Sequence, residues 1–150
     1  MEPTPVQLEP FTVSGLGLRT RNAAEADPST ARIPGLWDRF MAEGLAERLG
    51  GSSPAVHGVY TAYESDQHGS YQVLAGVKVE RPVPGFDSID IPPGRYLRFD
   101  GRGPLPQAII ETWARVWSHF EKPGAPGRRF LADFETYGPG EAVSIHVSIH

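Results

Sequence analysis

The sequence predicts an α+β fold in which a β-α-β-β unit occurs twice, forming an antiparallel sheet with two main helices on one face and the other face left to water, to a partner chain or to a concave groove. Short runs rich in β-forming residues alternate with two longer segments whose apolar residues have helical spacing. The order strand, helix, strand, strand occurs over about residues 6–81 and again over 94–150. A chain of 150 residues is long enough for one domain with a core, so residues 1–150 are predicted to be a single domain.

The first unit opens with a predicted strand over residues 6–20, and residues 21–30 are predicted to be a loop. From Ile33 to Leu49, apolar residues recur three and four positions apart, which is typical of a helix with one buried face. Pro34 suits the first turn of that helix, because the first backbone amides of a helix have no internal partner.

A predicted hairpin completes the first unit. Residues 55–65 and 70–80 are rich in β-forming residues and are separated by turn-forming ones, which favours two antiparallel strands. The proline-rich stretch 81–94 is predicted to be a connection to the second half of the chain.

The second unit repeats this order. Residues 95–103 predict a strand, and residues 105–122 predict a helix with aromatic and aliphatic side chains along one stripe. Residues 128–138 and 141–150 predict another hairpin. The letters LWDRF and YTAY of the first unit correspond to VWSHF and FETY of the second, which supports a duplication.

Composition excludes several classes of function. The net charge of -4 offers no basic footprint for nucleic acid, so direct nucleic-acid binding is not expected. The absence of cysteine removes disulfides, thiol nucleophiles and thiolate metal sites. No apolar run approaches the roughly 18 residues of a membrane-spanning helix, and the first residues do not resemble a signal peptide. We therefore expect a cytoplasmic protein without membrane association or cofactor.

The first strand of the last hairpin carries a carboxylate near its middle. Strict alternation places Phe130 and Phe134 on the core face, and places Asp133, Glu135 and Tyr137 on the opposite face. Because the two helices are expected to cover the core face, Glu135 should lie on the other face, which is left to water, to a partner chain or to a groove. Spacing alone fits a solvated Glu135 equally well, and Asp133 is interpreted as solvated or salt-bridged.

The repeat relates Tyr63 to Tyr137, so two tyrosines are expected beside Glu135. Aromatic ring faces attract cations by roughly 0.5–2 kcal/mol each, and a partly buried carboxylate would supply the counter-charge. Such a site would favour flat, apolar, cationic molecules.

Six segments, in this order, resemble one known family: IPGLWDRF, VYTAYESD, SYQVLAGVKV, IPPGRYLRFDGRGP, TWARVWSHF and RRFLADFETYG. They span nearly the whole chain and resemble the GyrI-like domain, also called the AraC-type or bacterial transcription activator effector-binding domain. The resemblance implies two SHS2-like units around a central ligand groove. Because no DNA-binding segment precedes Val6, the chain is expected to be a stand-alone member.

The resemblance also implies a ligand-contacting glutamate at the position of Glu135 and a pocket walled by aromatic rings. The alternative for each of these aromatic residues is membership of a cross-strand aromatic pair without a ligand. Trp37 and Trp117 are interpreted as core residues. The predicted ligand-binding residues are Glu135, Tyr63, Tyr71, Phe99, Trp113 and Tyr137.

Two main functions follow from the resemblance. The first is a small-molecule-binding protein that holds lipophilic, planar or cationic compounds of the drug type, for sequestration or sensing. The second is a hydrolase that opens cyclopropane rings of DNA-alkylating natural products, in which Glu135 would activate water and Tyr137 would polarise a carbonyl. Gyrase-inhibitory proteins also occur in the family. Enzymatic activity and a protein partner stay open, and binding is preferred because a carboxylate in an aromatic groove suffices for it.

The five histidines do not predict a metal site. His146 and His150 are four residues apart on a strand, about 13 Å at roughly 3.3 Å per residue, which is too far for one ion. Polar residues alternating outward on a terminal strand explain this pair better. His57, His68 and His119 have no carboxylate or cysteine at ligand spacing.

Overall fold

The computed structural model describes residues 2–51, 55–66, 68–138 and 140–150. Within them the strands form one antiparallel eight-stranded sheet, in the order β1-β6-β8-β7-β3-β4-β2-β5. The strands are β1 (Thr4–Leu8), β2 (Phe11–Arg21), β3 (Val56–Thr61), β4 (Ser70–Val79), β5 (Asp87–Ile91), β6 (Gly94–Arg102), β7 (Arg128–Tyr137) and β8 (Ala142–Ile149). The helices are α1 (Asn22–Glu25), α2 (Ile33–Ala42), α3 (Leu45–Arg48) and α4 (Gln107–Glu121).

The predicted fold class is confirmed. The first half supplies β2, α2, β3 and β4 in the predicted order, and the second half supplies β6, α4, β7 and β8. The two halves meet where β3 pairs with β7 at the centre of the sheet. Each half also lends a strand to the other, because β1 pairs with β6 and β5 pairs with β2. The strand order is therefore symmetrical about the β3–β7 junction.

Three segments differ from the sequence-based prediction. The strand predicted over 6–20 is two strands, β1 and β2, with Pro10 in the connection between them. The loop predicted over 21–30 contains the short helix α1. The connection predicted over 81–94 contains β5, an edge strand. Short edge elements of this kind have weak hydrophobic patterns because one side of each faces solvent.

The helix predicted from Ile33 to Leu49 is divided at Gly44. This residue has φ 59 and ψ 39, a left-handed conformation that glycine adopts without a steric penalty. The turn ends α2 and starts α3, and it brings Leu45 into the core with no exposed surface. The apolar pattern continues through the break because both short helices pack on the same side of the sheet.

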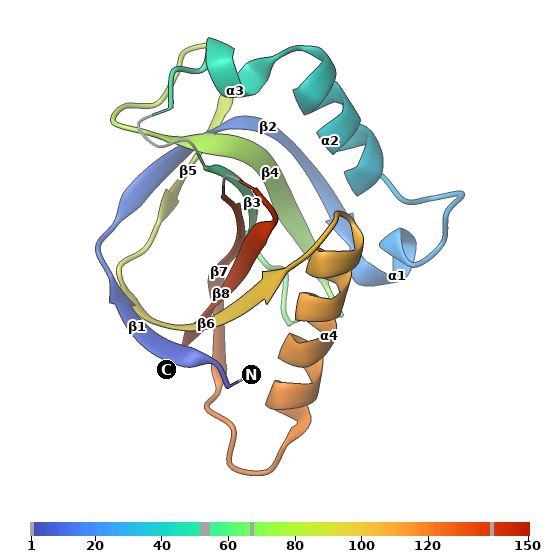
Figure 1. The fold of residues 1–150 in the computed structure, drawn as a ribbon, viewed down its shortest axis with the longest axis vertical. Coiled ribbons are helices and arrows are strands. Elements are labelled where there is room, and N and C mark those ends of the chain that lie inside the picture. Colours follow the sequence, from blue (N-terminus) through green and yellow to red (C-terminus); the bar gives the residue numbers. More distant parts are fainter. Residues whose placement is uncertain (1, 52–54, 67, 139) are drawn as a thin grey trace.

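The sheet is strongly curved, and α2 and α4 lie outside the curve (Figure 1). Apolar side chains fill both faces of this curved layer. One cluster lies between the sheet and α2 with α3, and a second lies between the sheet and α4. The third fills the concave face, away from the helices, and consists of Val13, Val59, Leu74, Ile91, Tyr96, Ala132 and Phe134.

This arrangement corrects the predicted position of the groove. Phe134 is indeed a core residue, but its core is the concave cluster, which the helices do not cover. Glu135 points the other way, toward the helices, where it contacts Trp113 of α4. The alternation along β7 was interpreted correctly at these two residues. The helices, however, cover the face that carries the carboxylate, so a site at Glu135 lies between sheet and helices.

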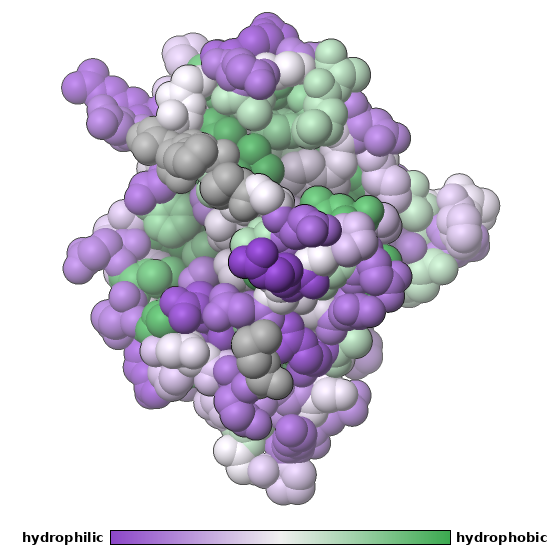
Figure 2. All heavy atoms as spheres, in the orientation of Figure 1, coloured by the Kyte–Doolittle hydropathy of each residue, from purple (hydrophilic) through white to green (hydrophobic). Residues whose placement is uncertain are grey.

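The surface shows no sign of a broad apolar region on the side displayed in Figure 2, where hydrophilic side chains predominate and hydrophobic ones form separate small patches. Among the described residues, no helix has the length and apolar character needed to cross a membrane.

Candidate functional site

Glu135 is buried at the centre of the sheet, with 3% of its surface exposed. It lies on β7 directly opposite Gly58 of β3. A Cβ atom on Gly58 would stand 2.5 Å from Oε1 of Glu135 and 3.1 Å from the ring of Trp37. The glycine is therefore required for space, because it lets a carboxylate and an indole meet over the strand.

Three neutral groups donate hydrogen bonds to this carboxylate. The hydroxyl of Tyr60 and the indole N–H of Trp113 donate to Oε2, at 2.8 and 2.7 Å. The hydroxyl of Tyr137 donates to Oε1 at 2.7 Å. Among the described residues, no lysine, arginine or histidine nitrogen forms an ion pair with Glu135. Within the described part of the chain, the carboxylate therefore has dipolar hydrogen-bond partners but no counter-charge.

Burial and hydrogen bonding act on Glu135 in opposite directions. Burial raises the pKa of its carboxyl group above the ordinary value of 4.5, and the donors Trp113, Tyr137 and Tyr60 partly lower it. The pKa values of Tyr60 and Tyr137 are raised, first by burial and then by the neighbouring carboxylate. Both tyrosines therefore keep their protons at neutral pH and act as donors to Glu135.

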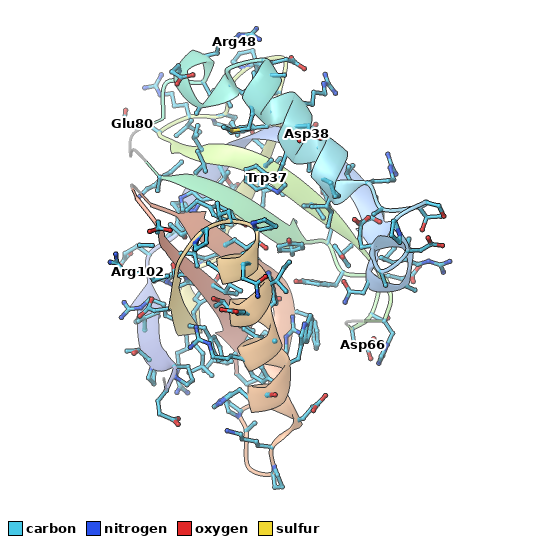
Figure 3. The ribbon with its side chains drawn as sticks, turned by 45° about the vertical axis from the view of Figure 1, so that its right-hand side comes forward. Trp37, Asp38, Arg48, Asp66, Glu80 and Arg102 are labelled. Atoms are coloured by element: carbon cyan, nitrogen blue, oxygen red, sulfur yellow. The ribbon has the colours of Figure 1, made fainter. Side chains whose placement is uncertain are left out.

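The rings around Glu135 come from both helices and from the sheet. Trp37 lies on the side of α2 that faces the strands (Figure 3), and its ring meets that of Tyr137 edge-on at 5.4 Å. On the α4 side, the rings of Tyr60 and Trp113 meet at 5.5 Å with an interplanar angle of 83°. Edge-to-face contacts of this kind fix the rings in place, so the cage around Glu135 is preorganised.

A cavity of about 170 Å³ opens beside this cage, between α1, the start of α2 and α4. Tyr60 and Trp113 form the wall that it shares with Glu135. Its lining is mostly aromatic, with one acidic and one basic side chain. The lining residues are Asn22, Glu25, Ile33, Tyr60, Tyr63, Tyr71, Trp113, Trp117 and Arg128.

The structure gathers four of the predicted site residues around this cavity. Tyr63, Tyr71 and Trp113 line it, and Glu135 lies directly behind the Tyr60–Trp113 wall. Tyr60 is a lining residue that the sequence analysis did not assign. The pairing of β3 with β7 sets the position of Tyr60. Tyr60 is two residues after Gly58, which pairs with Glu135, so alternation puts the side chain of Tyr60 on the face of Glu135 once that pairing is known.

Two predicted site residues lie elsewhere. Tyr137 contacts Glu135 but on the side away from the cavity, where it lines a separate hollow near Leu105. Phe99 is buried on β6 beneath α4, where its ring packs against His119 and Phe120. It does not line the cavity, because β6 is two strands away from β7 in the sheet.

Trp117 corrects a second expectation. It was interpreted as a core residue, yet 37% of it is exposed and its ring lines the cavity. The indole stacks on Trp113 at 5.4 Å with an interplanar angle of 24°. The two tryptophans are four residues apart on α4, so they form a continuous aromatic wall along one side of the helix.

Asp133 is fully buried, and so the solvated alternative for it was wrong while the salt-bridged one was correct. Nη2 of Arg128 donates to its Oδ2 at 2.7 Å, and the hydroxyl of Tyr63 donates to the same oxygen at 2.5 Å. The backbone amide of Ser148 donates to Oδ1 at 2.9 Å. This second carboxylate has the cationic partner that Glu135 lacks.

Phe130 was predicted on the face of Phe134 but lies on the cavity side, where its ring meets that of Tyr63 at 5.5 Å. The strand register of β7 is irregular between Arg128 and Asp133, and Phe130 has φ 53. The irregularity breaks the alternation on which the prediction depended.

The outward position predicted for His146 was also wrong. Strand β8 is internal to the sheet, and the His146 ring stacks on Phe134 on the concave face at 4.5 Å. Burial lowers the pKa of His146 to about 4, and burial likewise lowers that of His57 to about 4. Within the described part of the chain, no three His, Asp or Glu side chains are grouped to hold a metal ion.

Comparison with known proteins identifies the family. The family model of Cass2, described as integron-associated effector binding protein, matches residues 6–149. The chain belongs to the Cass2 family. The GyrI-like resemblance of the sequence is thereby confirmed. A comparison with curated proteins gave no match.

Solved structures extend this result. The Cass2-family chain is 32% identical to an integron cassette protein from the mobile metagenome of Vibrio cholerae, with a TM-score of 0.88 over 99% of this chain and 96% of that one. It has the fold of SAV2435, solved bound to tetraphenylphosphonium, at 21% identity and a TM-score of 0.84 over 100% and 94% of the two chains. It also has the fold of a putative transcription regulation protein of Staphylococcus aureus MU50, at 22% identity and a TM-score of 0.81 over 99% and 98%.

Proposed function

We propose that this protein binds a lipophilic, planar or cationic small molecule in the aromatic cavity, with Glu135 as the counter-charge. The observation that carries the proposal is the electrostatic state of Glu135. A buried carboxylate with three neutral donors and no cation among its described neighbours is left partly uncompensated. A cation in the neighbouring cavity would partly balance this charge across the wall formed by Tyr60 and Trp113.

The rings between Glu135 and the cavity extend the electrostatic effect of the carboxylate into the cavity. Tyr60 and Trp113 both donate to the carboxylate, which increases the electron density of their rings. Their faces, together with those of Tyr63, Tyr71 and Trp117, then attract a cation by the ring quadrupole. An apolar cation gains both from these rings and from burial of its own apolar surface.

Two findings from the comparisons support the proposal. The family is one of effector-binding proteins, and a protein of the same fold was solved with the lipophilic cation tetraphenylphosphonium. The cavity volume of about 170 Å³ is below the roughly 300 Å³ of a site for a drug-sized ligand. We infer that one or two aromatic rings of the ligand enter the cavity and that the remainder lies at its mouth, against Trp117.

Hydrolysis receives less support from this geometry. The hydroxyls of Tyr60 and Tyr137 are engaged with Glu135, so neither is directed at a substrate carbonyl. Glu135 itself does not line the cavity, so a water between it and a substrate would require the wall to open. Binding for sequestration or sensing needs neither step.

The test is calorimetric titration with tetraphenylphosphonium and with tetraphenylborate, which has the same four rings and no oxygen acceptor but a negative charge. The proposal expects saturable binding of the cation and at least tenfold weaker binding of the anion, because only the cation is attracted by Glu135 and the ring faces. Equal affinities, or no binding of the phosphonium, would rule the proposal out. Chromatography of samples incubated with a cyclopropanoid alkylator would reveal hydrolysis, should ring-opened product exceed the protein-free rate.

A further inference from the structure

The cavity lining contains one basic side chain, Arg128, which the proposed function does not use. Arg128, at the start of β7, lines the cavity with only 7% of its side chain exposed. Its Cζ atom lies 4.3 Å from the ring centre of Phe130 and 5.5 Å from that of Trp117. The guanidinium is therefore held between two rings, which fixes its plane at the aromatic wall.

The irregular register of β7 creates this position. Arg128 pairs with Ile149 and Asp133 pairs with Val147, so five steps along β7 match only two along β8. In a regular strand, residues five steps apart lie on opposite faces, which would separate Arg128 from Asp133. The additional residues between them turn Arg128 back toward Asp133, so both side chains lie on the cavity side.

Most of the hydrogen-bonding capacity of Arg128 is unused. A guanidinium has five N–H donors, and among the described residues only Asp133 accepts from it, at Nη2. Its Nε has no acceptor among the described residues, but this atom is enclosed and cannot reach a ligand. Nη1 is not enclosed in this way, and none of the described residues accepts a hydrogen bond from it. Because Arg128 lines the cavity, the N–H groups of Nη1 are the donors left for a ligand.

The neighbouring Asp133 has hydrogen-bond donors other than Arg128. It already accepts from the hydroxyl of Tyr63 and from the amide and hydroxyl of Ser148. Its remaining function toward Arg128 is to balance the charge and hold one edge of the guanidinium. The N–H groups of Nη1 remain available to an oxygen atom of a ligand in the cavity.

We propose that Arg128 is a ligand-binding residue and that the preferred ligands are lipophilic cations that also carry an oxygen acceptor, above all a carboxylate. The inference rests on the proposed function. In this arrangement the cationic part lies over Tyr60 and Trp113, near Glu135, and the acceptor lies at Arg128. The tyrosines between them contact the apolar body of the ligand, so the cavity selects a zwitterion with separated charges.

A matched pair of probes tests this directly. Pentyltriphenylphosphonium and (4-carboxybutyl)triphenylphosphonium have the same rings, the same cation and chains of similar length, but only the second ends in a carboxylate. Calorimetric titration of the wild-type protein is expected to show tighter binding of the carboxybutyl compound. Weaker binding of that compound than of the pentyl compound would overturn the inference.

Two variants assign the preference to Arg128. Arg128→Lys keeps a cation beside Asp133 but loses the planar fork. The double variant Arg128→Gln with Asp133→Asn removes both charges, so no unpaired charge stays buried, and circular dichroism with thermal melting confirms its folding. In both variants the ratio of the dissociation constant of the pentyl compound to that of the carboxybutyl compound should fall about tenfold, which reports the carboxylate preference independently of any change in the binding of the shared rings. An unchanged preference in a folded variant would refute the role of Arg128.

The outcomes separate the two proposals. When the pentyl compound binds and the wild type shows no preference for the carboxylate, the role of Arg128 fails and the proposed function stands. When neither phosphonium binds, both proposals fail.

Discussion

The indole N–H of Trp113 donates a 2.7 Å hydrogen bond to Oε2 of Glu135, which joins α4 to the central strand β7. Through this bond, a helix of the second unit covers the carboxylate of the same unit. From the first unit, Tyr60 reaches the same oxygen and Trp37 covers the space over Gly58. Both units are therefore needed to build one cage, and the candidate site lies at the junction of the two units.

The donors to Glu135 should set its protonation. Tyr60→Phe and Tyr137→Phe each remove one hydrogen bond to the carboxylate, which costs roughly 1–2 kcal/mol of stability and raises the pKa of Glu135 further. The affinity for tetraphenylphosphonium is expected to fall as Glu135 becomes protonated on acidification. The pH at which this affinity is halved should therefore be higher in both variants than in the wild type. Tyr71→Phe is the control, because its hydroxyl donates to Asn22 instead. A midpoint unchanged by either substitution would contradict the assigned hydrogen bonds.

The space that Gly58 leaves between the sheet and Trp37 gives a second prediction. Gly58→Ala would place a methyl group 2.5 Å from Oε1 of Glu135, so the carboxylate or Trp37 must move. We expect a loss of about 1–3 kcal/mol in urea unfolding and weaker cation binding. Gly35→Ala is the matched control, since its Cβ has no atom within 4 Å and alanine favours helix α2. Equal stability of Gly58→Ala and wild type would show that the cage is loosely packed.

How far the sequence predicted this site depends on which residues are considered. Glu135 and Tyr137 were placed on one face by alternation, and the structure agrees because β7 is regular there. Phe130 was misplaced because the same strand is irregular between Arg128 and Asp133, and an irregularity of this kind leaves no mark in an apolar pattern. Those additional residues also bring Arg128 to the cavity, so the sequence did not suggest it as a site residue.

The layers of the fold show a similar limit. The order of elements in each unit followed from periodicity, since both hairpins and both main helices have strong patterns. Periodicity did not show which face of the sheet the helices cover, because both faces of the curved sheet are apolar and only the packing of the helices distinguishes them. Trp117 was misassigned for a related reason. Helical spacing puts it in line with the buried stripe but does not reveal that the stripe borders a cavity.

The concave-face histidines predict loss of stability in acid. The pKa values of His57 and His146 fall from 6.5 in the unfolded chain to about 4 in the folded protein, so between these values only the unfolded chain is protonated. Stability present above pH 6.5 is therefore lost as the pH falls toward 4, by about 2 kcal/mol per histidine at pH 5.

Urea unfolding of the wild type and of His146→Gln at pH 7.5 and 5.0 checks this. The decrease in unfolding free energy between the two pH values should be about 2 kcal/mol smaller in the variant, because one titrating group is gone. The raised pKa of Glu135 acts in the opposite sense, adding stability on acidification, but it contributes equally to both proteins. Identical decreases would mean that His146 is already protonated in the folded state.

The most direct test of the central claim is the affinity of Glu135→Gln for tetraphenylphosphonium at pH 7.5. Glu9→Gln, on the exposed turn between β1 and β2, removes the same charge far from the cavity and serves as the control. The account predicts at least tenfold weaker binding by Glu135→Gln and a change of less than twofold in Glu9→Gln. Equal affinity of Glu135→Gln and wild type would show that the buried carboxylate is not the counter-charge of the ligand.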